Sequence, residues 1–137
     1  MGSGSGQPGA AGTITTDACV LVVDDDTSVR TSVAEILRVA GYRVREAGDG
    51  ESALDQLARH RVGVVVLDLR MPERDGMGVL AAVGAHAPPV VLVSGYPLAG
   101  DAGVHTDPHV FMVLQKPFKP VALLDAVAGA MGLRVTA

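Results

Sequence analysis

Val62-Gly-Val-Val-Val-Leu-Asp68 decides the fold: it is a short apolar run, rich in β-branched residues, that stops at an acid. Such a run is typical of a strand that is buried on both faces, as in a parallel sheet covered by helices. Three other short runs are mainly apolar and end at or just before a polar residue, and they are Cys19–Val23, Val90–Val93 and Val110–Gln115. Tyr42–Glu46 alternates apolar and polar residues like a half-buried strand. The sequence therefore predicts five strands.

Segments with helical periodicity lie between these runs. Ser28–Ala40 carries apolar residues at the spacing of an amphipathic helix, and Asp49 could cap a second helix over about Gly50–Arg59. A closing helix is predicted over about Pro120–Met131, because proline suits the first turn of a helix. We expect the inward stripe of this last helix to comprise Val121, Leu124, Val127 and Ala128.

Strands that alternate with helices predict an α/β fold, a three-layer sandwich in which about five helices cover a parallel sheet. The third helix is expected over about Gly76–Ala85. Glycines and prolines recur between Pro97 and Pro108, so the fourth helix is expected to be short or irregular. Residues 1–17 are rich in Gly, Ser and Thr and are expected to form a flexible tail or linker, or an expression remnant. Residues 18–137 form the one predicted domain.

The composition narrows the classes of protein. The chain has 137 residues, of which 48% are hydrophobic, and a formal net charge of −4, which argues against a generic nucleic-acid or anionic-membrane surface. No apolar stretch approaches the roughly 18 residues of a membrane span. The Met1-Gly-Ser-Gly-Ser-Gly start does not resemble a secretory signal, so a cytoplasmic protein is expected. The single cysteine, Cys19, is expected to be a buried thiol.

Polar residues follow the predicted strands at the point where each one ends. Asp24, Asp25 and Asp26 follow the first strand, Asp68 the third, Ser94 the fourth and Lys116 the fifth. The carboxyl ends of parallel strands share one edge of the sheet, so these side chains should gather there. Carboxylates that crowd together retain a proton or bind a cation, and oxygen ligands favour a hard ion such as Mg²⁺. A lysine and a hydroxyl beside them suit a phosphoryl group.

Four stretches together resemble the signatures of response-regulator receiver domains of bacterial two-component signalling. They are Leu21-Val-Val-Asp-Asp-Asp26, Val64-Val-Val-Leu-Asp-Leu-Arg-Met-Pro-Glu-Arg-Asp-Gly76, Val91-Leu-Val-Ser-Gly-Tyr96 and Leu114-Gln-Lys-Pro-Phe118. The resemblance covers the chain from Cys19 to its end. It implies a flavodoxin-like sheet with the strand order 2-1-3-4-5. It also implies a signalling phosphoacceptor in a phosphorelay, rather than an enzyme acting on other substrates.

The resemblance implies a phosphorylation site and a metal site. Asp68 would receive the phosphoryl group from the phosphohistidine of a histidine kinase or a histidine phosphotransfer protein. Asp25 and Asp68 would bind Mg²⁺, or Mn²⁺, directly, together with the backbone carbonyl of Arg70. Asp24 would act through a water molecule, whereas Asp26 reads as a capping or loop acid.

The same resemblance assigns the phosphate contacts and the switch. Lys116 would contact the phosphoryl group, and the bond between Lys116 and Pro117 would be cis. Ser94 would move toward the phosphoryl group as the switch. Arg70 and Tyr96 stand where the family tunes the lifetime of the acyl phosphate. The family usually has an aromatic switch residue three positions before the lysine, where this chain has Val113. Strand alternation would put Phe111 on the same face as Val113, which leaves the switch and the oligomeric state open.

Two alternatives compete with this interpretation. Asp24-Asp-Asp-Thr-Ser28 resembles the nucleophile motif of haloacid-dehalogenase-type phosphohydrolases, with Asp24 as the nucleophile. A degenerate receiver that acts only as a protein-interaction module is the second alternative. Within the receiver interpretation, the chain is either a stand-alone regulator or the receiver of a hybrid histidine kinase, and the wording of the motifs slightly favours the latter.

Overall fold

The computed structural model describes residues 18–68, 88–95 and 110–132. In chain order its elements are β1 (Cys19–Val23), α1 (Thr27–Val39), β2 (Val44–Ala47), α2 (Gly50–Arg59), β3 (Val62–Asp68), β4 (Val90–Ser94), β5 (Val110–Gln115) and α4 (Pro120–Met131). The tail over residues 1–17, the helix expected over Gly76–Ala85 and the irregular segment over Pro97–Pro108 lie outside the described residues. No described helix combines the length and the apolar character that a membrane span requires.

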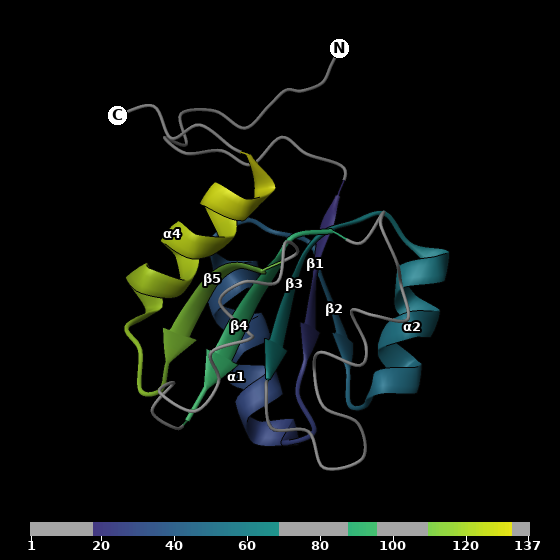
Figure 1. Cartoon of the computed structure of the whole chain (residues 1–137), viewed down its shortest axis with the longest axis horizontal. Helices are drawn as coiled ribbons and strands as arrows, with labels where there is room; N and C mark the ends of the chain where they lie inside the picture. The colour runs from purple at the N-terminus through teal and green to yellow at the C-terminus, as the bar shows by residue number, and fades with distance from the viewer. Residues whose placement is uncertain (1–17, 69–87, 96–109, 133–137) are drawn as a thin grey trace.

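The five predicted strands form one parallel sheet, and their order is β2-β1-β3-β4-β5, as the resemblance implied (Figure 1). Val22 on β1 pairs with Val66 on β3, and Val66 pairs with Val91 on β4. All five residues of β1 and of β4 are buried. The apolar runs that stop at acids or Ser94 are therefore the central strands, as expected for a sheet that is covered on both faces.

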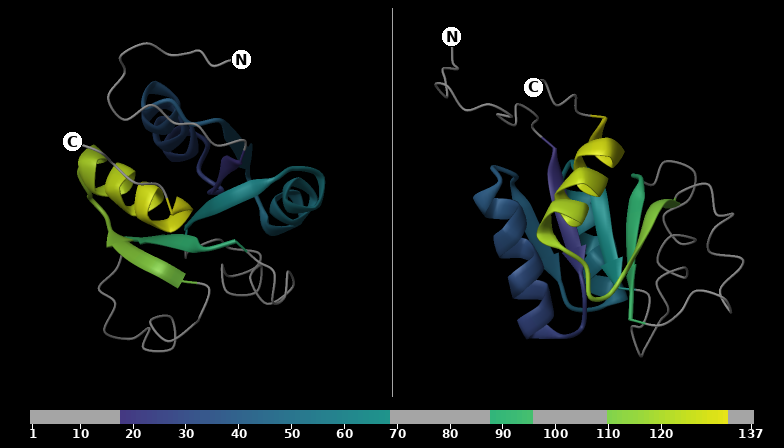
Figure 2. Two further views of the ribbon diagram at one scale, coloured as in Figure 1. Left: turned by 90° about the horizontal axis from the view of Figure 1, so that it is seen from above. Right: turned by 90° about the vertical axis from the view of Figure 1, so that its left-hand side faces the viewer.

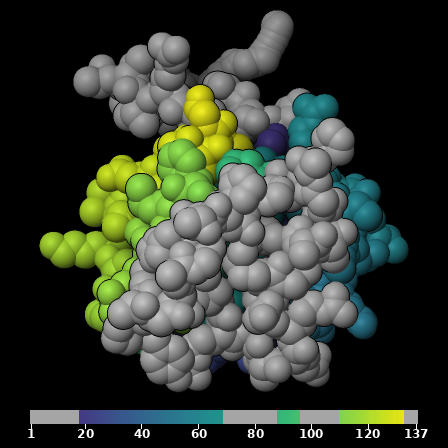
Figure 3. Space-filling model, viewed as in Figure 1, coloured from purple at the N-terminus to yellow at the C-terminus, as the bar shows by residue number. Residues whose placement is uncertain are grey.

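Helices cover the two faces of this sheet and complete a three-layer sandwich. Viewed from above, α1 and α4 lie on one side of the sheet and α2 on the other (Figure 2). The first core cluster joins α1 and α4 to the sheet through buried residues such as Leu37 and Leu123. The second cluster joins α2 to the opposite face through Ala53 and Leu92. In the space-filling view, side chains of β5 and α4 form one side of the surface and those of α2 the other (Figure 3).

Aspartates cap the first two helices. The Asp26 carboxylate accepts a hydrogen bond from the backbone N–H of Val29 at 3.1 Å, and Asp49 accepts one from Ser52 at 2.7 Å. Each bond satisfies a backbone donor that the first turn of a helix leaves unpaired. Both capping roles were predicted. The cap at Asp26 turns the chain directly after β1, so that α1 starts beside the end of that strand.

The buried face of α4 agrees only in part with the expected stripe. Val127 is buried and Leu124 packs against the first cluster, as expected. Leu123 and Ala126 are also buried, whereas Val121 is 59% exposed. The helix is apolar almost all round, so a period of 3.6 residues could not select one face from the sequence. Contact with the sheet and with α1 selects the face in the folded protein.

A β-bulge in β5 corrects the expectation for Phe111. Val90 pairs with Val110, but Val91 pairs with Met112, so Phe111 is an extra residue on its strand. An extra residue breaks the alternation of side chains between the two faces. The Phe111 ring packs against Gly129 of α4, whereas Val113 packs with the second cluster on the other side of the sheet. Phe111 therefore does not share a face with Val113.

The N-terminal end of β2 also differs from the prediction. The strand starts at Val44, and Tyr42 precedes it. The Tyr42 ring is buried in the first cluster, and its N–H donates to the carbonyl of Leu37 at 3.1 Å. Gly41, with φ of 104°, provides the left-handed turn between α1 and Tyr42.

The core predicts a contrast between two neighbouring residues of α1. Leu37 is fully buried, and Val39 is 79% exposed. Leu37→Ala should lower the free energy of unfolding by about 2–5 kcal/mol, because it removes buried apolar surface and leaves a cavity. Val39→Ala should change it by less than about 0.5 kcal/mol. Urea unfolding followed by circular dichroism measures both, and equal losses would contradict the packing described for α1.

Candidate functional site

The carboxyl edge of the sheet carries a cavity of about 330 Å³. Its described lining residues are Asp24, Asp25, Asp26, Val29, Asp68, Gly95 and Lys116. These residues follow β1, β3, β4 and β5, or begin α1, as the order of the strands predicts for a ligand site in such a sheet. The structure thus brings together the acids and the lysine that the sequence placed at strand ends.

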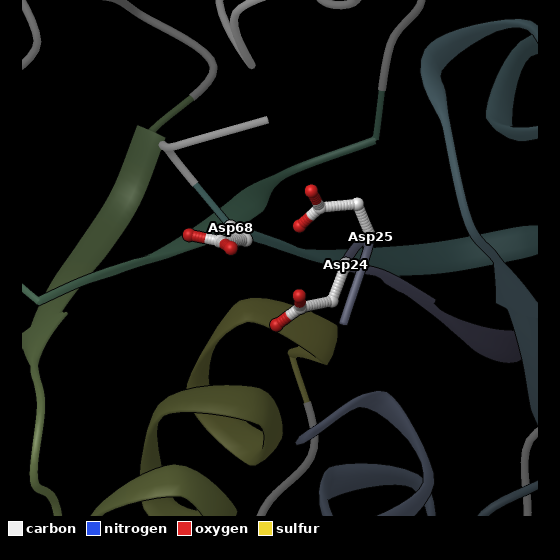
Figure 4. Close-up of side chains that lie close together, drawn as sticks. All are labelled: Asp24, Asp25 and Asp68. Carbon is white, nitrogen blue, oxygen red and sulfur yellow. The ribbon is translucent and has the colours of Figure 1, made fainter. Parts of the chain in front are cut away.

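Three of the carboxylates that line this cavity lie close together (Figure 4). Asp24, Asp25 and Asp68 each offer an oxygen atom, and these atoms lie within 4.8 Å of one another. Asp24 and Asp68 are buried, with 5% and 8% of their surface exposed, whereas Asp25 is exposed to solvent. Charges at such distances repel one another strongly when water is largely excluded. The arrangement therefore favours a bound cation or a retained proton.

Asp24 is held from several sides. Its N–H donates to the carbonyl of Ala47 at 3.1 Å, and its Oδ1 accepts a hydrogen bond from the N–H of Asp26 at 2.9 Å. Its backbone carbonyl accepts a hydrogen bond from Arg30 Nη1 at 2.8 Å. Lys116 Nζ lies 3.9 Å from Asp24 Oδ2. Four groups thus fix the residue that opens the turn between β1 and α1.

The environment of Asp24 favours its protonated form. Burial raises the pKa of the carboxyl from 3.8 to about 6, and the negative charge of Asp68 adds to the rise. The N–H of Asp26 and the ammonium of Lys116 act in the opposite direction and lower the pKa. Burial outweighs both of them. A cation between the carboxylates would reverse this balance by stabilising the ionised form.

Ser94 and Lys116 join two strand ends at the same edge. The N–H of Lys116 donates to the carbonyl of Ser94 at 2.7 Å, and Ser94 is 1% exposed. The Lys116 side chain is 31% exposed and reaches the cavity. The Lys116–Pro117 bond is cis, as the resemblance implied. The cavity lining includes Gly95 rather than its neighbour Ser94.

Two residues of the expected site, Arg70 and Tyr96, lie outside the described residues. Arg30 contacts the site as well, because its guanidinium donates a hydrogen bond to the carbonyl of Asp24. The sequence analysis did not select this residue, although its place in the first turns of a helix is unusual for a cation. A cation near the N-terminal end of a helix is unfavourable for the helix dipole, so a specific partner could have been expected there.

Comparison with protein families decides the identity of the fold. The model of the response regulator receiver domain matches residues 20–128. The chain belongs to the response regulator receiver domain family. It is therefore a phosphoacceptor domain of two-component signalling, which confirms the receiver interpretation over a phosphohydrolase of the haloacid-dehalogenase type.

Curated relatives and solved structures agree with this assignment. The transcriptional regulatory protein PdtaR of Mycobacterium tuberculosis is 31% identical over 110 residues, which are 79% of this chain and 54% of that protein. The transcriptional regulatory protein GlrR of Escherichia coli is 35% identical over 116 residues, or 83% of this chain and 26% of that protein. The receiver domain thus spans about half of the one relative and about a quarter of the other.

Solved receiver structures share the fold. The chemotaxis protein CheY4 of Vibrio cholerae is 29% identical with a TM-score of 0.77, over 84% of this chain and 99% of that chain. A response regulator receiver protein of Burkholderia phymatum is 28% identical with a TM-score of 0.77, over 88% of this chain and 99% of that chain.

The raised pKa of Asp24 predicts a dependence of stability on pH in the absence of metal. The native protein keeps this proton up to about pH 6, whereas the unfolded chain loses it near 3.8. The native state binds more protons in that window, so the free energy of unfolding should fall as pH rises from 4 to 6. Asp24→Asn should remove this fall and stabilise the protein at pH 7.5 by about 1–3 kcal/mol, since one pKa unit corresponds to about 1.4 kcal/mol.

Urea unfolding of both proteins in EDTA, at about pH 3 and at pH 7.5, measures this effect. The two proteins should have similar stability at about pH 3, which lies below the unfolded-state value of 3.8, because Asp24 is then largely protonated in both the native and the unfolded state. An Asn variant that is no more stable than the wild type at pH 7.5 would contradict the assigned role of burial.

Proposed function

We propose that Asp68 is the phosphoacceptor of this receiver domain and that Asp25, Asp68 and Asp24 hold the divalent cation its phosphorylation requires. The observation that carries the proposal is the approach of three carboxylates to within 4.8 Å at the end of the central strand β3. Only Asp68 among them comes from this strand, so a phosphodonor would approach it between the acids that follow β1 and Lys116. The set of acids is complete, which favours an active receiver over a degenerate one.

The chemistry of the donors fits Mg²⁺, or Mn²⁺. All three side chains offer oxygen, and these hard ions prefer oxygen ligands. We assign direct contacts to Asp25 and Asp68, a contact through water to Asp24, and a backbone contact to the carbonyl of Arg70. When bound, the ion neutralises charge on the carboxylates and on the phosphoryl oxygens.

The residues of the chain then position a single substitution at phosphorus. An oxygen of the Asp68 carboxylate attacks the phosphorus of a phosphohistidine. The new O–P bond forms as the P–N bond breaks, and the electron pair of the broken P–N bond stays on the imidazole nitrogen. Lys116, whose ammonium already lies at the cavity, pairs with a phosphoryl oxygen. The Ser94 hydroxyl donates to another.

The readout of phosphorylation is proposed to differ from the usual aromatic switch. Ser94 still links β4 to β5 through the hydrogen bond from the N–H of Lys116. Val113, by contrast, is aliphatic and packs with the second core cluster. We assign the switch to Ser94 and Val113, and the lifetime of the acyl phosphate to Arg70 and Tyr96.

A histidine kinase or a histidine phosphotransfer protein is the proposed donor. An apolar groove of about 830 Å³ between α1 and α4 supports this proposal, because Ile36, Val39 and Leu124 line it. The same helix α1 provides Val29 to the acidic cavity. A helix of the donor that packs into the groove would thus contact the same helix that borders the acidic cavity. Amphipathic helices commonly bind in such grooves.

The organisation of the longer protein follows the same proposal. Residues 18–137 form the receiver, and residues 1–17 are a tail or a linker. The receiver of a hybrid histidine kinase is slightly preferred to a stand-alone regulator. Direct contact with nucleic acid or membrane is not part of the proposed role. A cytoplasmic location is proposed because histidine kinases take their phosphoryl group from cytoplasmic ATP.

Labelling with acetyl phosphate tests the acceptor. In the presence of Mg²⁺, borohydride reduction followed by tryptic mass spectrometry should place the acyl phosphate of the wild type on Asp68. EDTA should abolish labelling, because the carboxylates then repel the phosphodonor. Asp68→Asn should show none. An adduct on Asp24, or labelling that persists in Asp68→Asn, would contradict the assignment.

A second experiment tests the groove with a histidine kinase that phosphorylates the wild type. Val39→Asp places a charge on the exposed apolar surface of α1 and should slow transfer from the phosphorylated kinase by about 10-fold, since a charge in an apolar contact is costly. Labelling by acetyl phosphate should stay within about twofold of the wild type, because the acidic cavity is unchanged.

Ala58→Asp is the matched control, because Ala58 is an exposed residue in the last turn of α2 on the other face of the sheet. It should leave both rates unchanged. Equal slowing in the two variants, or none in Val39→Asp, would contradict docking at the groove.

A further inference from the structure

Arg30 connects the turn after β1 to the edge strand β2. Its Nη1 donates to the backbone carbonyl of Asp24 at 2.8 Å, and its Nε donates to Glu46 Oε1 at 3.2 Å. A weaker contact joins Nη2 to Thr27 Oγ1 at 3.5 Å. The side chain is only 18% exposed. The guanidinium therefore lies between a carbonyl of the acidic turn and a carboxylate of the sheet.

Gly48 packs closely against the guanidinium of Arg30 and so restricts where that group can lie. A Cβ atom added to Gly48 would lie 3.2 Å from Arg30 Nη1, which is closer than ordinary van der Waals contact. The planar guanidinium binds two acceptors at once, which a lysine ammonium does less well. A cation in the early part of a helix opposes the helix dipole, so helix formation alone does not favour arginine here.

We propose that Arg30 is a positioning residue for the cation site: it fixes the Asp24–Asp25 peptide and thereby the direction of the Asp25 carboxylate. This inference rests on the proposed cation-binding role of the acids. The N–H of Asp24 donates to the carbonyl of Ala47 in the sheet, and the Oδ1 of Asp24 accepts a hydrogen bond from the N–H of Asp26. The carbonyl of Asp24 accepts a hydrogen bond from Arg30. Loss of that bond frees the plane of the peptide on which Asp25 is carried.

The direction in which removal of Arg30 changes the affinity for the cation distinguishes a positioning role from simple electrostatic repulsion. A positive side chain near a cation site weakens cation binding through repulsion, so its removal should strengthen binding. Positioning predicts the reverse, because a mobile Asp25 carboxylate must be ordered again when the cation binds. Glu46 already compensates the charge of Arg30 at 3.2 Å, which favours the geometric effect.

Arg38 provides a matched control within the same network. Its Nη2 lies 3.2 Å from Glu46 Oε2 and 3.4 Å from the carbonyl of Val44. It shares the carboxylate partner of Arg30 and lies on the same helix. Within the described part of the chain, Arg38 makes no hydrogen bond or ion pair with the acidic turn, so its loss perturbs the ion pair with Glu46 and leaves the contacts of Asp24 in place.

Calorimetric titration with Mg²⁺ tests the proposal on the full chain. Arg30→Met should raise the dissociation constant for Mg²⁺ by about 10-fold, the usual effect of losing a residue that orients a ligand. Arg30→Lys should recover part of the affinity, since an ammonium can still donate to the Asp24 carbonyl. Arg38→Met should stay within about twofold of the wild type. Amide hydrogen exchange in EDTA should accelerate at Asp26, whose N–H donates to Asp24 Oδ1, in Arg30→Met and not in Arg38→Met.

Gly48→Ala gives a milder perturbation that keeps every charge in place. Its Cβ displaces the guanidinium by a few tenths of an ångström, so the affinity for Mg²⁺ should fall in the same direction. If Arg30→Met does not fold, as judged by circular dichroism, Gly48→Ala and Arg30→Lys decide the proposal.

Unchanged or tighter Mg²⁺ binding in the folded Arg30 variants, or equal losses in Arg30→Met and Arg38→Met, would overturn the inference. A wild type that binds no Mg²⁺ would instead contradict the proposed cation role. In that case the amide exchange at Asp26 still decides whether Arg30 holds the turn.

Discussion

Carboxylates crowd together at the ends of the central strands, and the fold has to hold them there against their mutual repulsion. Asp24 and Asp68 are buried beside each other, and burial raises the pKa of Asp24 to about 6. Such a pair lowers the stability of the ionised metal-free protein. The fold tolerates it because apolar strands on both sides, with Leu21, Leu67 and Leu92 fully buried, hold the strand ends in place. Function and stability therefore oppose each other at this edge.

The polar contacts around the acids have one effect in common. The N–H of Asp26, the ammonium of Lys116 and the guanidinium of Arg30 all reach Asp24, from α1 and from the end of β5. They limit the directions that the carboxylates can take before any ligand arrives. A site that is ordered in advance loses less entropy on binding. The turn between β1 and α1 is thus part of the functional site as well as part of the helix cap.

Local patterns predicted the strands and the gathering of the acids, because both depend on short runs and on strand direction, whereas the order of the strands came from the resemblance to receiver domains. Three features escaped the local patterns for physical reasons. The face of α4 depends on packing, since its sequence is apolar all round. The bulge at Phe111 depends on the register between β4 and β5. The contact of Arg30 with Asp24 joins residues whose geometry only the folded turn defines.

The bulge in β5 separates the chemistry of the site from its surface. Without the extra residue, Phe111 would face the same side as Val113 and could occupy the space of an aromatic switch. With it, the ring packs on Gly129 of α4, while Val113 contributes an aliphatic side chain to the opposite cluster. A displacement of Ser94 would therefore be transmitted to β5 through the hydrogen bond from the N–H of Lys116 and through the aliphatic packing of Val113. It would not be transmitted through the rotation of an aromatic ring.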